Sequence, residues 1–320
     1  MSRLALLVAC ALFSGLASAS AQTYPQRTVK FILPFGPGSG TDITARLVAD
    51  KLAARWGKPT VIENRPGGDG LVSINAFVGA NDDHTLLWVP VGTFAVHPFQ
   101  HDKLPYNAET DLLPIANVSS LFLAATTSMA MNVGSLREFV ELVRANPGKY
   151  NWATANGNAD FLMSGFLKSN GLQMAKVPYR DITQAPNDLA ENRIQLLSSS
   201  LAVATPLMQA GKIKVLAVTG RQRAPSAPNV PTVIEAGYPA LVMESIGGIF
   251  GPRGMPLELR ERIAADVRAA VASDPSIAEK LQATGQVIDV RGPKEFAAGI
   301  KEMNDKLAAI AKVLGLKSAQ

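Results

Sequence analysis

A glycine-rich turn near the start of the chain places the strongest constraint on its fold. The segment 34–42, PFGPGSGTD, follows an apolar strand pattern at 29–33 and opens an amphipathic helical pattern. Glycines let backbone N–H groups approach a ligand, and the first turn of a helix offers free N–H groups and a positive dipole end. The turn predicts a site for a carboxylate or phosphate, with an ordinary strand-to-helix turn as the alternative.

Two nucleotide-binding motifs do not fit this turn. The dinucleotide fingerprint needs Gly or Ala six positions on from Gly36, counted inclusively, where Thr41 stands. A P-loop needs Gly-Lys-Ser/Thr, which this turn lacks. Because no lysine can reach outer phosphates here, a carboxylate matches the turn better than a nucleotide.

The N-terminus has the pattern of a secretory signal. Arg3 precedes an apolar run at 4–16, and small residues ending in Ala19-Ser20-Ala21 follow. A charged, an apolar and an A-x-A region in this order are typical of a cleaved leader. We therefore expect residues 1–21 to be removed and the protein to reach the periplasm. The single cysteine, Cys10, lies in this leader, where lipidation is an alternative, so we expect no disulfide in the mature chain.

Size and charge indicate two domains and a small acidic ligand. The roughly 300 residues after the leader exceed what one core usually supports, so two domains with a cleft between them are expected. Lys and Arg number 31 against 26 Asp and Glu, giving a net charge of +5 spread along the chain. Nucleic acid would require clustered basic residues with aromatic interleaving, whereas aromatic residues make up only 6%. We expect a small anion and no nucleic acid as partner.

Strand patterns alternate with helical patterns, which predicts an α/β fold with mostly parallel sheets flanked by helices. Ligands in such sheets bind at the carboxyl ends of strands, so the loops 34–42, 64–70 and 90–93 should converge. The later strands are expected at 60–63, 85–89, 151–154, 175–177, 194–198 and 215–219.

A second series of strands and helices begins near Leu121, and the extended run 241–250 leads back. The helices that start at Pro256, Pro275 and Pro293 are expected to pack on the first domain. This order predicts a discontinuous first domain, 22–122 plus 244–320, a second domain, 123–243, and two crossovers between them.

An ordered set of short motifs then covers essentially the whole mature chain. It comprises YP at 24–25, PFxPGxGTD at 34–42, ENRPG at 63–67, GT at 92–93, KLPY at 103–106, PGK at 147–149, VPYR at 177–180, AGK at 210–212, LAVT at 216–219 and PxVPTxxEAG at 228–237. This set resembles the Bug or TctC family, the periplasmic solute receptors of tripartite tricarboxylate transporters.

The resemblance implies a two-domain Venus-flytrap fold that closes on an organic anion, often a dicarboxylate, and delivers it to integral-membrane subunits. In the family, backbone N–H groups, hydroxyls and ordered water of the first loop and the Gly-Thr loop hold one carboxylate. The candidate residues carried over to the first domain are Phe35, Gly38, Ser39, Gly40, Thr41, Asp42, Gly68, Gly92 and Thr93. Asp42 would repel an anion, so it should cap the helix or position water.

The second-domain loop departs from the family pattern. Where Ser and Thr hydroxyls are usual, this chain has Asn156 and Asn158, followed by Asp160. Asp160 is expected to cap the following helix, with a contact to a ligand ammonium or hydroxyl as the alternative.

Three further positions bear on the ligand. Ser199, at a strand end, could donate to a carboxylate, Tyr179 could form a cleft wall, and Arg180 could pair with a distal acid group or make a surface salt bridge. Ile246 stands where an aromatic residue is common, which leaves room for a bulkier or aromatic acid.

Two other functions remain as alternatives: a ligand sensor for a signalling partner and a secreted enzyme acting on a small organic acid. No H-E-x-x-H or G-x-S-x-G motif is present, so we expect neither catalysis nor a metal or cofactor. His97 and His101 have helical spacing, but the intervening Pro98 favours loop or solvent-facing roles for them.

Overall fold

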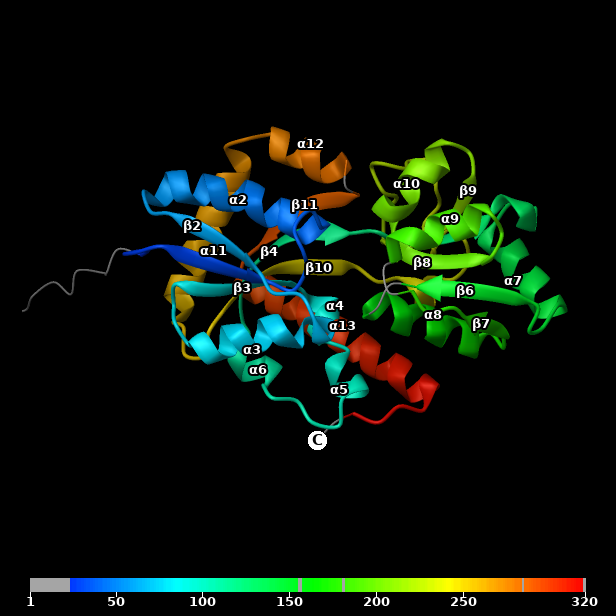
Figure 1. Ribbon diagram of the computed structural model, residues 1–320, viewed down its shortest axis with the longest axis horizontal. Helices are drawn as coiled ribbons and strands as arrows, with labels where there is room; N and C mark the ends of the chain where they lie inside the picture. Colours follow the sequence, from blue (N-terminus) through cyan, green and yellow to red (C-terminus); the bar gives the residue numbers. More distant parts are fainter. Residues whose placement is uncertain (1–23, 155–156, 180–181, 284, 319–320) are drawn as a thin grey trace, which may run out of the picture.

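The computed structural model describes residues 24–154, 157–179, 182–283 and 285–318. Two sheets with flanking helices lie side by side (Figure 1). The expected leader, Asn156 and Arg180 lie outside the described residues, so what the sequence predicts for them stays a prediction.

The first sheet carries the glycine-rich turn and has the strand order β11-β4-β10-β3-β1-β2. Strand β1 is parallel to its neighbours β2 and β3. Strand β10 runs antiparallel to both β3 and β4, and β11 runs antiparallel to β4. The strand bounds are β1 Val29–Leu33, β2 Thr60–Asn64, β3 Thr85–Pro90, β4 Leu113–Leu121, β10 Ser245–Gly251 and β11 Gln286–Arg291.

The second sheet has the order β7-β6-β8-β5-β9. Strand β6 is parallel to β7 and β8, and β5 is antiparallel to β8 and β9. The bounds are β5 Leu123–Ser128, β6 Tyr150–Thr154, β7 Met174–Lys176, β8 Leu196–Ser200 and β9 Ile213–Val218.

The two-sheet α/β architecture with two crossovers is confirmed, but the sheets are mixed rather than mostly parallel. Five of the nine described strand pairings are antiparallel. The antiparallel pairings come from the strands at the crossovers. Strand β4 leads into β5 of the second sheet through Phe122 alone, and β10 follows the return of the chain to the first sheet. These strands therefore run opposite to their neighbours that are joined through helices.

The helices begin and end largely where the sequence signals predict. Ser39 caps α2, and Gly57 ends it in the left-handed conformation at φ 62°. The helix bounds are α2 Gly40–Trp56, α3 Leu71–Ala80, α4 Val91–Phe94, α5 His97–Gln100, α6 Ala108–Asp111, α7 Leu136–Ala145, α8 Asn158–Ser169, α9 Ala185–Ala190, α10 Leu201–Gln209, α11 Leu257–Ala272, α12 Ser276–Ala283 and α13 Pro293–Leu314.

The last helix does not stay on the first sheet as predicted. It packs on β4 at one end and on α8, beside the second sheet, at the other (Figure 1). Gly165 of α8 lies so close to Ile310 that a Cβ there would be 2.7 Å from its Cγ2 atom, and Lys168 Nζ donates to the carbonyl of Leu314 at 3.0 Å. Helix α13 is therefore a third link between the two sheets.

Within the described residues, no helix has the length and apolar character needed to cross a membrane.

Candidate functional site

Three loops meet at the carboxyl edge of the first sheet, as the sequence predicts. Asn64, at the end of β2, donates through Nδ2 to the carbonyl of Phe35 at 2.8 Å. In the second glycine loop, a Cβ on Gly70 would lie 2.5 Å from Thr93 Cγ2. Gly70 also has φ +98°, so both its conformation and the approach of Thr93 require glycine.

The first turn of α2 is held by Asp42. Ser39 is the N-cap and accepts from the Asp42 amide at 3.2 Å, while the Asp42 carboxylate reaches back to the Gly38 amide at 2.9 Å. The carboxylate also accepts from Asn64 Nδ2 at 2.9 Å and Arg46 Nε at 3.0 Å, and the residue is 2% exposed. Asp42 thus takes part in capping, although the N-cap itself is Ser39.

Burial by itself would raise the pKa of the Asp42 carboxyl. The hydrogen bonds from Arg46, Asn64 and the Gly38 amide outweigh burial and hold this pKa below its ordinary value. The carboxylate is therefore ionised and fully engaged at neutral pH, which leaves it unsuited to contact an anionic ligand.

The amides of Gly40 and Thr41 are open at this turn. Among the described residues, neither amide nitrogen has a hydrogen-bond acceptor, because the Ser39 side chain takes only the Asp42 amide. These two N–H groups, at the positive end of a 17-residue helix, are suited to an anion.

The sequence analysis did not predict a role for Gln286, the first residue of β11, which forms a hydrogen bond to the first turn of α2. Its Nε2 donates to the Gly40 carbonyl at 3.1 Å, and its Oε1 accepts from the hydroxyls of Thr44 and Ser119 at 3.0 and 2.9 Å. A small cavity opens beside it, lined by Thr41, Trp88, Pro90, Ser119, Leu121, Gly247 and Gln286. The β-branched residues Val287, Ile288 and Val290 were the available signal for β11.

The second sheet contributes Asn158 from the start of α8. Its N-cap is Gly157, which has no capping side chain, and Asn158 is 7% exposed. Its Nδ2 atom is buried and has no hydrogen-bond partner among the described residues. A Cβ on Gly92 would lie 2.5 Å from Asn158 Cγ, so the loops of the two sheets touch here.

Asp160 does not cap α8, contrary to the preferred expectation. It lies in the first turn, and its carboxylate accepts from Ser164 Oγ at 3.0 Å and pairs with Lys176 Nζ at 2.6 Å. Gly157 occupies the cap position, and Asp160 is the third residue of the helix, three positions after the cap.

Tyr179 and Ser199 lie near the same edge of the second sheet but are engaged with neighbours. The Tyr179 hydroxyl donates to Asp188 at 2.6 Å, and burial together with Asp188 raises its pKa to about 12. Ser199 is fully buried and donates to the Ser200 carbonyl at 3.3 Å. Phe35, Gly38 and Gly68 are exposed on the first sheet's loops.

The expectation for His97 is wrong: it is fully buried, and α5 forms with Pro98 in its first turn, where proline is tolerated. Its Nδ1 is 2.7 Å from the Tyr106 hydroxyl and its Nε2 is 3.0 Å from the Asp69 carbonyl. Burial lowers the pKa of His97, so the neutral ring accepts from Tyr106 and donates to Asp69. His97 thereby supports the second glycine loop.

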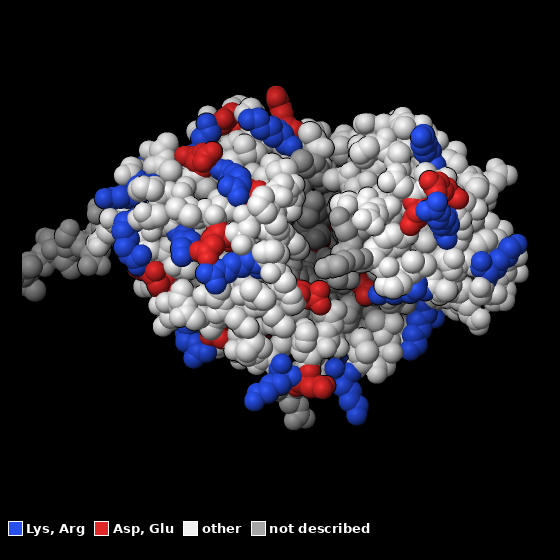
Figure 2. Space-filling view, viewed as in Figure 1, with Lys and Arg blue, Asp and Glu red and all other residues white. Residues whose placement is uncertain are grey.

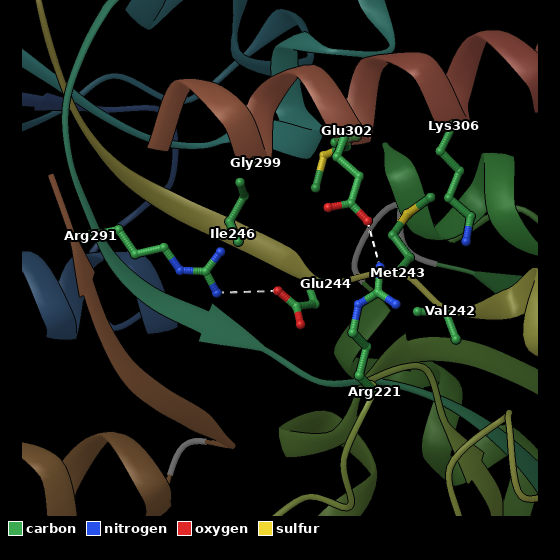
Figure 3. A pocket seen from close by; sticks show the side chains of 10 residues that line it. Arg221, Val242, Met243, Glu244, Ile246, Arg291, Gly299, Glu302 and Lys306 are labelled. Carbon is green, nitrogen blue, oxygen red and sulfur yellow. Dashed lines mark hydrogen bonds and ion pairs between the residues drawn. The ribbon is translucent and has the colours of Figure 1, made fainter. Parts of the chain in front are cut away.

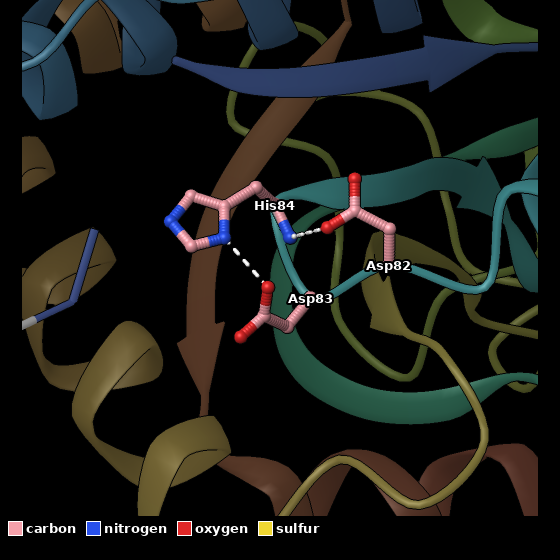
Figure 4. A group of neighbouring side chains, drawn as sticks. All are labelled: Asp82, Asp83 and His84. Atoms are coloured by element: carbon pink, nitrogen blue, oxygen red, sulfur yellow. Dashed lines mark hydrogen bonds and ion pairs between the residues drawn. The ribbon is translucent and has the colours of Figure 1, made fainter. Parts of the chain in front are cut away.

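Asp82, Asp83 and His84 form a cluster that could be mistaken for a metal site (Figure 4). His84 Nδ1 is 2.6 Å from Asp83 Oδ1, and its Nε2 accepts from the Gln26 amide at 3.0 Å. Asp82 accepts from the His84 amide and Thr85 and pairs with Arg27. Each group has a protein partner, so the cluster is explained by the turn that precedes β3.

Figure 2 shows a hollow between the two halves of the molecule, with Lys and Arg interspersed among Asp and Glu on this face. The converging loops and the Gly92–Asn158 contact join elements of both sheets. The donors without a described acceptor, the Gly40 and Thr41 amides and Asn158 Nδ2, belong to these two sets of loops.

Comparison with known proteins identifies the relatives of the chain. Residues 44–316 match the model of the tripartite tricarboxylate transporter family receptor. Protein BugT of Bordetella pertussis is 27% identical over 305 residues, which cover 94% of this chain and 93% of BugT.

Two solved structures have the same fold over their full length. MatC of Rhodopseudomonas palustris with bound malate has a TM-score of 0.77 and 26% identity, covering 90% of this chain and 99% of MatC. The R. palustris protein Rpa4515 with adipate has a TM-score of 0.78 and 26% identity, covering 93% and 100%. The two-domain binding-protein fold is thereby confirmed, and the chain belongs to the tripartite tricarboxylate transporter receptor family, TctC.

Proposed function

We propose that this protein is a periplasmic receptor that binds a small organic acid between its two sheets. The observation that carries the proposal is the buried Nδ2 of Asn158, a hydrogen-bond donor without a described partner at the contact between the sheets. A buried unpaired donor costs about 1–3 kcal/mol, so a ligand oxygen at this position would be favoured.

The first sheet offers the complementary group of donors. The amides of Gly40 and Thr41 at the positive end of α2 would hold one carboxylate. Thr93, which lies against Gly70 of the second glycine loop, is a further proposed contact. The acids bound by MatC and Rpa4515, malate and adipate, support a carboxylate ligand here. Asn156 and Arg180 remain proposed contacts from the second domain.

Closure of the cleft follows from the same contacts. We propose domains at 22–122 plus 244–320 and at 123–243, with hinge motion at the crossovers. The acid would dock on the α2 turn first, and Asn158 would then reach it from the second domain. Since Asn158 contacts the acid only when the domains are closed, its bond supplies differential affinity for the closed form.

The loaded receptor would deliver its acid to the membrane subunits of a tripartite transporter after export by its leader. An enzymatic function has less support, since His84 and His97 are both held by structural hydrogen bonds. A sensor partner would recognise the same closed form, and no contact of the described residues favours it.

The test is a calorimetric titration of the mature chain, residues 22–320, with malate and adipate, followed by aromatic and hydroxy acids. We expect at least one acid to bind and to raise the melting temperature, because a ligand of the folded state adds RT ln(1 + [L]/Kd) to stability. Binding of neutral or cationic solutes with no response to any acid would refute the proposal. Turnover of the acid without added cofactor would favour the enzyme instead.

A further inference from the structure

A second groove lies at the connection between the two sheets, and its lining includes neither the residues of the α2 turn nor Asn158. Its walls are the second crossover, the end of β11 and the middle of α13 (Figure 3). Its volume is about 40 Å³, and Met243 and Met303 give it an apolar side. A water-sized position needs roughly 10–15 Å³, so the groove has room for roughly three to four non-hydrogen atoms.

Three ion pairs lie at this groove. Arg221, after β9, pairs with Glu302 of α13 at 2.6 Å, and Arg291 pairs with Glu244 at 3.3 Å and with Asp289 at 2.6 Å. Both carboxylates that line the groove are thus already paired with an arginine (Figure 3).

Lys306 is the remaining cation. It is half-buried, and among the described residues no hydrogen bond or ion pair reaches its ammonium group. Burial lowers the pKa of Lys306, the charge of Arg221 lowers it further, and Glu302 opposes both. Because the Glu302 carboxylate already pairs with Arg221, the ammonium group of Lys306 is an uncompensated positive charge at the end of the groove where Arg221 lies.

We propose that this groove is a second anion site, which takes a small carboxylate of the size of acetate between Lys306 and Arg221. The carboxylate would compensate the ammonium group, and burying a charge is tolerable only when it is paired. The methyl group would contact the methionine side chains. A larger acid would exceed the volume of the groove.

The position of the groove couples it to the hinge. Glu244 directly precedes β10, where the chain returns to the first sheet, and Arg221 follows β9 of the second sheet. Lys306 belongs to α13, which packs on β4 of the first sheet and on α8 beside the second. A bound carboxylate would tie the crossover to α13 and so change the affinity of the cleft for its acid. By linkage, an acid in the cleft would change the affinity of the groove by the same factor.

In the experiment, the mature chain is titrated with sodium acetate, which replaces sodium chloride so that the ionic strength stays constant. Acetate binding is measured by calorimetry and by the change in melting temperature. The test variant is Lys306→Met. The matched control is Lys301→Met on the same helix, where the Lys301 side chain is 76% exposed and pairs with Asp305. Arg221→Gln, at an exposed ion pair, serves as a second test variant if Lys306→Met does not fold.

We expect acetate to stabilise the wild type and Lys301→Met beyond chloride, and Lys306→Met to bind it at least 10-fold more weakly. Without acetate, Lys306→Met should be as stable as the wild type or more so, because an uncompensated cation is removed. Equal acetate binding by wild type and Lys306→Met, or a wild type that responds only to ionic strength, would overturn the proposal. Asn158→Asp separates the two sites, since it should impair the cleft and keep the acetate response.

Discussion

The side chain of Asn158, at the start of α8, lies against the backbone of Gly92, in α4 directly after β3. A Cβ on Gly92 would be 2.5 Å from Asn158 Cγ and 2.6 Å from its Oδ1. Helix α4 follows a strand of the first sheet and α8 follows a strand of the second, so this contact exists only while the two sheets are close together. It also requires glycine at position 92, because a side chain there would collide with Asn158.

Replacement of Gly92 by alanine should therefore hinder closure more than folding. The new methyl group would displace Asn158, while the helical backbone at position 92 accepts alanine without strain. We expect acid affinity to fall at least 10-fold in calorimetry, with a change in melting temperature of only a few degrees.

The control is Gly79→Ala, in α3, where no atom lies within 4 Å of the new Cβ. It should keep the wild-type affinity and be neutral or slightly stabilising, since alanine is the better helix former by roughly 1 kcal/mol. An unchanged affinity in a folded Gly92→Ala protein would contradict the placement of Asn158 in the closed site.

Asn158→Asp should convert the donor into a negative charge beside the bound acid. At neutral pH the carboxylate would repel the ligand, and we expect the affinity to fall by a factor of 10 or more. Lowering the pH toward 4.5 should restore part of it as the new carboxyl is protonated. Asn187→Asp, which makes the same charge change at an exposed position, should show neither effect.

Asp42→Asn should loosen the first turn of α2. The variant loses the charge-assisted bond from Arg46 and weakens acceptance from the Gly38 amide, which predicts a loss of about 1–3 kcal/mol in the free energy of unfolding. Acid affinity should fall as well, because the Gly40 and Thr41 amides would lose their fixed direction. A variant with unchanged stability in urea would show that the Asp42 contacts contribute little.

The pH dependence of stability provides a second measure of Asp42. Its folded pKa lies below the unfolded value, so its stabilisation is present above the unfolded pKa and is lost as the pH falls below about 4. Urea unfolding of the wild type should therefore weaken over this range more steeply than that of Asp42→Asn. Parallel curves would exclude Asp42 as the group responsible.

Tyr106→Phe should destabilise the support of the second glycine loop. Without the hydroxyl, the buried Nδ1 of His97 loses its partner at 2.7 Å, and we expect a loss of about 1–3 kcal/mol. Hydrogen exchange of the amides at 67–70 should increase, because His97 also holds the Asp69 carbonyl. Faster exchange throughout the sheet instead would indicate a global effect.

His97 itself predicts a loss of stability in mild acid. Its folded pKa is below the unfolded value, so the unfolded chain takes up a proton first as the pH falls below about 6.5. Stability should therefore fall from pH 7.5 to the folded pKa, and His97→Gln should reduce this slope. An unchanged slope would assign the effect to another group.

Much of the first domain could be predicted because its signals are local. A strand and a glycine-rich turn depend on neighbours in sequence, and so the strand at 29–33 and the helix that follows the turn at 34–42 could be predicted from residue types. The N-cap could not, because Asp42 was the expected capping residue and Ser39 takes that position. The convergence of the loops after β1, β2 and β3 follows from the parallel order of these strands.

The sequence by itself thus determined the α/β class, the family and the glycine-rich turn that leads into α2. Tertiary structure alone decided the mixed sheets, the burial of His97, the role of Gln286 and the bridging path of α13. These features depend on contacts between residues far apart in the chain, such as Gln286 with Gly40 and Gly92 with Asn158. No local pattern encodes such a contact, because its energy depends on which distant backbone and side-chain atoms the crossovers bring together.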